Sequence, residues 1–111
     1  MNQFLIIVRG SDHSTATPEK MQARMNAFGN WVQNVLKGAY VGGAPLEDFN
    51  ARLLTSKKDI ATDGPFMESK EMISGYIVFT ATDIEAATEL TKECPLLNEF
   101  KLELRQMKPM N

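Results

Sequence analysis

The chain has 111 residues, of which 43% are apolar, and its formal net charge is −2. This length and apolar fraction predict a single compact domain over residues 1–111. Because Lys and Arg are dispersed rather than clustered, the composition excludes the electrostatic footprint of a nucleic-acid binder and gives no support for binding to an anionic membrane surface.

The counts of cysteine and histidine narrow the chemistry further. Cys94 is the single cysteine and His13 the single histidine, so an intramolecular disulfide is excluded and the chain cannot build a Cys/His zinc site of its own. We expect neither a metal nor a cofactor. The apolar run at residues 4–8 is much shorter than a signal-peptide core or a membrane span, and a cytoplasmic protein without membrane contact is therefore expected.

The first third of the chain predicts a strand followed by a long helix. Residues 4–8 are continuously apolar and rich in β-branched side chains, as in a buried strand. Thr17 and Pro18 indicate a helix start, since Thr17 can accept a free backbone N–H and Pro18 suits the first turn. Gly38 is the expected stop. One apolar face is predicted from residues at gaps of four and three: Met21, Met25, Phe28, Val32 and Val35.

The middle of the chain is expected to be less regular. Residues 39–41 are a candidate for a short strand that gives way to a loop at the glycines and proline of residues 42–45. Residues 52–54 and 60–61 are predicted to form a small exposed hairpin.

The last third predicts a strand, a helix and a strand. Residues 75–80 are apolar throughout, and the Thr82-x-x-Glu85 spacing has the form of a capping box. A helix is expected over residues 84–93, ended by Pro95. Residues 100–105 alternate between apolar and polar side chains, as a half-buried strand does.

The order of these elements predicts a ferredoxin-like βαββαβ sandwich with an inserted hairpin, of α+β class. Its central strands are the first and third, which are the two that are apolar on successive residues. Such strands bury both faces, whereas two helices cover one. We therefore expect a homodimer in which two sheets pack face to face, the alternative being that the long loop at residues 62–74 folds over the second face.

Residues 62–71 read TDGPFMESKE and are the clearest candidate for a functional segment. In the structural interpretation, Asp63 stabilises the turn, Pro65 stiffens it and Phe66 anchors it to the core. In the functional interpretation, the stiff turn holds Asp63 at the rim of a cleft, with Glu68 and Lys70 nearby to bind a polar ligand or move a proton. His13 is the side chain that titrates closest to neutral pH, and Cys94 is expected to be a buried, inert thiol.

With the DGPF motif of residues 63–66, followed by Glu68, Lys70 and the Gly75-Tyr76 pair, the sequence resembles the DGPF subgroup of the YCII-related family. The resemblance covers nearly the whole chain. Further shared features are an apolar first strand, a Pro18-Glu19-Lys20 helix start, Gly42-Gly43, Asp83 to Ala87, Cys94-Pro95 and Glu103-Leu104-Arg105.

The resemblance implies a dimeric α+β barrel, in which two ferredoxin-like sandwiches pair sheet to sheet. It does not specify a reaction, because this fold hosts enzymes and ligand sensors alike. Related YCII proteins carry a histidine on the first helix that is proposed to act with an aspartate. The matching position here is near Ala27, and no histidine lies on this helix, so the dyad does not transfer to this chain.

Two hypotheses for function remain. The first is a non-catalytic homodimer that binds a small polar or aromatic ligand in a cleft lined by the DGPF loop, or else a partner protein, with the loop as a structural clamp. The second is a cofactor-independent lyase or isomerase with Asp63 or His13 as the proton carrier. The expected ligand-binding residues are Gly64, Pro65, Phe66, Glu68, Lys70 and Tyr76.

Overall fold

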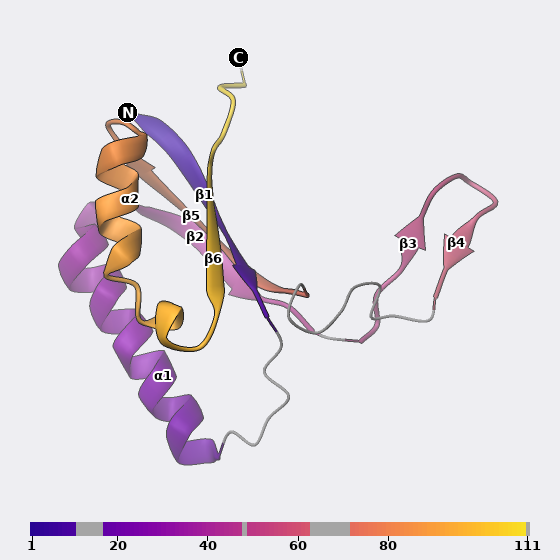
Figure 1. The fold of residues 1–111 in the computed structure, drawn as a ribbon, viewed down its shortest axis with the longest axis horizontal. Coiled ribbons are helices and arrows are strands. Elements are labelled where there is room, and N and C mark those ends of the chain that lie inside the picture. Colours follow the sequence, from indigo (N-terminus) through magenta and orange to yellow (C-terminus); the bar gives the residue numbers. More distant parts are fainter. Residues whose placement is uncertain (11–16, 48, 63–71, 111) are drawn as a thin grey trace.

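The computed structural model describes residues 1–10, 17–47, 49–62 and 72–110. The sheet has four antiparallel strands, β1 (Asn2–Arg9), β2 (Tyr40–Pro45), β5 (Ile73–Ala81) and β6 (Lys101–Gln106), in the order β2-β5-β1-β6. The helices α1 (Pro18–Trp31) and α2 (Ile84–Lys92) lie on one side of this sheet (Figure 1). This is the predicted ferredoxin-like sandwich, with the first and third core strands at its centre.

The core lies between the helices and one face of the sheet. Phe4 and Ile6 of β1 and Phe79 of β5 are completely buried there, and Phe4 and Phe79 pair directly across the two strands. Trp31 closes the core from α1 and donates its indole N–H to the carbonyl of Leu90 in α2, at 3.0 Å. This hydrogen bond joins the two helices above the sheet.

The start of α1 agrees with the prediction, but its later course does not. Thr17 is the N-cap and accepts the backbone N–H of Lys20. After Trp31 the chain continues as a π-helical turn (Val32–Leu36) and a 3-10 turn (Lys37–Ala39), and the backbone reverses at Lys37, with φ at 56°, rather than at Gly38. A positive φ is strained for a residue with a side chain, and the turns on either side of Lys37 hold its backbone in this conformation.

The predicted apolar face of α1 is buried only in its second half. Phe28 packs on the core, where its ring contacts Trp31 and Tyr40. Met21 and Met25 are 49% and 67% exposed. The periodicity therefore identified a helix correctly, but the helical period does not reveal how far along the helix the core extends.

The strand β2 is longer than the sequence indicated, because it includes the glycines and Pro45 that were expected to form a loop. These residues fit an edge strand. Proline has no N–H to donate, which matters less at the edge of a sheet than at its centre, and glycine lets the neighbouring backbone come close. A Cβ on Gly43 would clash with the carbonyl oxygen of Tyr76, whereas a Cβ on Gly42 would meet nothing within 4 Å. Gly43 thus allows β2 to pair closely with β5.

The inserted hairpin is present, formed by β3 (Leu53–Leu54) and β4 (Ile60–Ala61). We call residues 49–62 the arm. Figure 1 shows its two strands standing away from the sheet, on the side opposite the helices. The radius of gyration is 15.5 Å, compared with about 13 Å for a compact domain of this length.

The helix and strand in the last third of the chain agree with the prediction, except for the residue that caps the start of α2. Asp83, rather than Thr82, is the N-cap of α2, and its carboxylate accepts the backbone N–H of Ala86 at 2.8 Å. After α2, a short 3-10 turn (Pro95–Asn98) leads into β6. Arg24 of α1 makes a bidentate hydrogen bond with Glu99 and lies over the ring of Phe100, which fixes this turn against α1.

Candidate functional site

The face of the sheet away from the helices, which we call the open face, carries an apolar strip. In the antiparallel register, Ile7 of β1 lies between Tyr76 of β5 and Glu103 of β6. Two residues earlier, Leu5 lies between Val78 and Arg105. Leu5, Ile7 and Val78 are half-buried by their neighbours in the sheet, and Tyr76 is 39% exposed.

Charged side chains form the border of this strip on the side of β6. The Arg9 guanidinium donates to the Glu103 carboxylate at 2.8 Å, from both Nε and a terminal nitrogen. A guanidinium nitrogen of Arg105 lies 3.6 Å from the same carboxylate. An anionic ligand placed here would meet two guanidinium groups, and a neutral ligand would find hydrogen-bond donors beside an apolar surface.

Small residues form the border of the strip on the side of β2. Gly42 and Ala44 of β2 are the cross-strand partners of Val78 and Tyr76. They have little or no side chain with which to cover their partners, so the phenol of Tyr76 stays accessible from this edge. Apolar strip, phenol hydroxyl and charged border together form a surface suited to a flat ligand with polar substituents.

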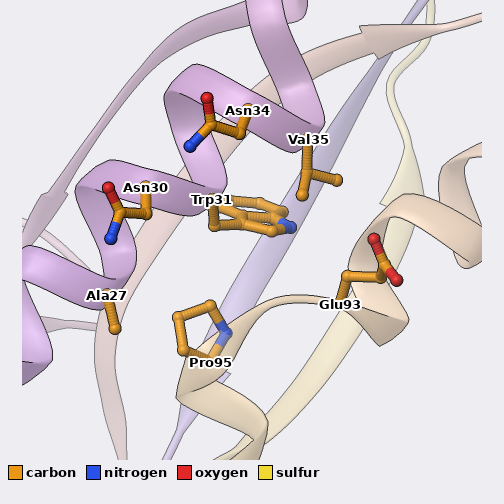
Figure 2. Close-up of a pocket in the computed structure, with 7 residues that line it drawn as sticks. All are labelled: Ala27, Asn30, Trp31, Asn34, Val35, Glu93 and Pro95. Carbon is orange, nitrogen blue, oxygen red and sulfur yellow. The ribbon is translucent and has the colours of Figure 1, made fainter.

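A groove lies on the other side of the sheet, between α1 and the end of α2 (Figure 2). It has a volume of about 350 Å³. Figure 2 shows the Trp31 ring between Asn30 and Asn34 on one side and Glu93 and Pro95 on the other. The lining residues are Ala27, Asn30, Trp31, Asn34, Val35, Glu93 and Pro95.

This groove, which we call the inter-helix groove, offers hydrogen-bonding groups but few side chains that could act as a catalytic acid, base or nucleophile. Asn30 and Asn34 supply amide donors and acceptors, and Glu93 supplies a carboxylate. Ala27, near which the sequence resemblance places the family's helix histidine, lines the groove with a methyl group. The sequence did not point to this groove, although the spacing of Asn30 and Asn34 by one helical turn was a signal for a shared face.

Of the predicted site residues, Tyr76 is the one that lies within the described part of the chain. Its side chain is on the open face and so lies across the sheet from the inter-helix groove. Asp63, His13, Gly64, Pro65, Phe66, Glu68 and Lys70 lie outside the described residues. Arg9, Glu103 and Arg105 of the open face were not predicted as site residues; the alternation of β6 placed two of them on one face.

Cys94 is buried in the core at 2% exposure. Burial raises the pKa of its thiol to about 11, although a backbone hydrogen bond at Leu96 acts in the opposite direction. The thiol is therefore protonated at neutral pH and is not available as a thiolate nucleophile. The predicted burial of this residue is confirmed.

Within residues 1–10, 17–47, 49–62 and 72–110, no group of three or more His, Cys, Asp or Glu side chains is arranged to hold a metal ion. None of the helices in these ranges combines the length and apolar character needed to cross a bilayer.

Comparison with known proteins identifies the family and the fold. The model of the YCII-related domain matches residues 3–111. Among solved structures, the chain is similar to 5-chloro-2-hydroxyhydroquinone dehydrochlorinase (TftG) from Burkholderia phenoliruptrix AC1100, in its complex with 2,5-dihydroxybenzoquinone. That match has a TM-score of 0.51 and 18% identity, and it covers 96% of this chain and 93% of the other. A comparison with curated protein sequences found no significant match.

Proposed function

Since this chain belongs to the YCII-related family, we propose that it is a cytoplasmic homodimer of the DGPF subgroup that binds a small polar or aromatic ligand. The ligand lies in a cleft on the open face, beside Tyr76 and the DGPF loop of residues 63–66. The observation that carries this proposal is the apolar strip on the open face, bordered by Arg9 and Arg105.

The chemistry of the open face favours a planar, oxygen-bearing ligand. Leu5, Ile7 and Val78 offer a surface on which a ring can lie, and the phenol of Tyr76 adds a hydrogen-bonding group at its edge. The guanidinium groups favour phenolate, enolate or carboxylate oxygens. TftG, whose fold this chain shares, is bound to 2,5-dihydroxybenzoquinone in its solved structure, which supports the same ligand class.

The dimer completes the cleft. Sheet-to-sheet pairing of two copies covers the open face, which the helices of the same chain leave uncovered. Where the two faces are not in full contact, a ligand is enclosed between a protomer and its partner, and exclusion of water strengthens its contacts with Arg9 and Arg105.

A thermal-shift assay tests the proposal. The probes are 2,5-dihydroxybenzoquinone and a panel of hydroxylated aromatic acids, because a ligand at about 100 times its dissociation constant adds roughly 2.7 kcal/mol to the native state. Tyr76→Ala should reduce the shift in melting temperature, whereas Asn34→Ala in the inter-helix groove should leave it unchanged. The proposal fails if no probe shifts the melting temperature, or if Asn34→Ala removes the shift and Tyr76→Ala does not.

A second candidate function is that of a lyase or isomerase that needs no cofactor. The name of TftG as a dehydrochlorinase favours it. In this version Asp63 or His13 carries the proton, and Lys70 holds an anionic group of the substrate. Asp63→Asn should then abolish turnover and leave the dimer intact. Retained turnover removes Asp63 from the mechanism, and a weakened dimer assigns it to the structure of the turn.

A further inference from the structure

The arm carries apolar side chains that are largely exposed. Leu53 and Ile60 are each 47% exposed, Leu54 is 62% exposed and Phe49 is 65% exposed. Leu54 and Ile60 are cross-strand partners, so they form one apolar surface on the hairpin. An isolated two-stranded hairpin is marginally stable in water, and this one is accordingly expected to pack against something.

The direction of the arm indicates what it packs against. Its strands stand on the side of the sheet opposite the helices, which is the side of the open face (Figure 1). A copy of the chain that covered the open face would therefore lie beside the arm. In a two-fold dimer each arm reaches the other protomer in the same way, so one association covers both the open face and the apolar surface of the arm.

The area that a stable interface needs supports this arrangement. A standard protein interface buries about 800 Å² of accessible surface on each partner. Leu5, Ile7 and Val78 already lose much of their surface within the sheet, so the more exposed side chains of the arm add apolar area to a contact between two sheets.

We propose that the arm of each protomer packs against a second copy of this chain, so that two arms clasp the dimer reciprocally. This inference rests on the dimer of the proposed function and deepens it. The arm follows β2, whose last residues include Ala44, the cross-strand partner of Tyr76. Docking of the arm would thus act on the strand that borders the ligand site and link dimer formation to ligand binding.

Sedimentation velocity over a concentration series tests the clasp. The variant Leu54→Ser/Ile60→Ser removes the apolar surface of the hairpin from both arms, and the dimer dissociation constant should rise at least ~100-fold. Leu97→Ser is the matched control, since Leu97 is 44% exposed but lies on the 3-10 turn after α2. It should leave the dissociation constant unchanged. Fluorescence of the buried Trp31 verifies that each variant is folded.

A third variant separates failure of the clasp from failure of the dimer. Val78→Arg places a charge in the centre of the open face and should dissociate the sheet-to-sheet dimer. If Val78→Arg dissociates the dimer and the arm variant does not, the clasp is overturned and the dimer stands. Equal weakening by Leu97→Ser also overturns the clasp. A wild-type protein that is monomeric at every concentration overturns both.

Discussion

Arg9 and Glu103 form a hydrogen-bonded ion pair, 2.8 Å long, between the neighbouring strands β1 and β6. Both side chains are partly buried, at 23% and 34% exposure, and Arg105 approaches the same carboxylate. The pair lies on the open face, beside Ile7. It therefore contributes to the stability of the sheet as well as to the charge of the candidate site.

Glu103→Gln should lower the free energy of unfolding by about 1 kcal/mol, because a partly buried charge-assisted hydrogen bond is replaced by a neutral one. Urea denaturation measures the change. The control is Glu89→Gln, whose exposed pairing with Lys92 should contribute less than about 0.5 kcal/mol. Equal losses in the two variants would contradict the prediction. A loss that grows with protein concentration would also place the pair at a dimer interface.

Gly43→Ala should destabilise the protein by about 2 kcal/mol. The added methyl group would meet the Tyr76 carbonyl oxygen and force β2 away from β5. Gly42→Ala adds the same group one residue earlier, where the space is open, and should change stability by less than about 0.5 kcal/mol. Thermal and urea unfolding of the two variants measure the contrast, and indistinguishable variants would show that the strands do not approach as described.

Asp83→Ala should cost about 1 kcal/mol, because it removes the side-chain acceptor for the Ala86 N–H at the start of α2. Thr82→Ala should be close to neutral, although the sequence pattern made Thr82 the expected cap. Chemical denaturation followed by circular dichroism distinguishes the two. A larger loss for Thr82→Ala than for Asp83→Ala would restore the capping box predicted from the sequence.

The stability of the protein should depend on the ionisation of Cys94. The pKa of its thiol is about 11 in the folded state and 9.0 in the ordinary case. The unfolded thiol therefore ionises first, and the stabilising contribution, complete below pH 9, is lost as the pH rises to 11. The wild type should lose on the order of 2 kcal/mol relative to Cys94→Ala between pH 8 and pH 11. Parallel pH profiles for the two proteins would contradict this result.

The regular elements and their order were predictable from the sequence, since each strand and helix has its own periodicity and boundary residues. The departures occur where tertiary packing outweighs local preference. Met21 and Met25 continue the helical period beyond the core, and Gly43 lies in a strand at a position where the neighbouring strand leaves no space for a side chain. Lys37 rather than Gly38 has a positive φ, which residues with a Cβ disfavour.

The candidate site was less predictable than the fold. Tyr76 was expected near a ligand, and it lies on the open face. The role of Arg9 depends on pairing with a strand more than ninety residues later, and no local pattern reveals that register. The inter-helix groove depends on contact between α1 and the end of α2, which also arises only on folding. The other predicted site residues stay predictions.

The position of β1 at the centre of the sheet has a consequence for synthesis of the protein. Its two neighbours, β5 and β6, both lie in the last 39 residues of the chain. During translation, the apolar β1 therefore leaves the ribosome long before either of its partners. Until β5 emerges, the apolar side chains of β1 have no strand to pair with, which favours aggregation of the nascent chain.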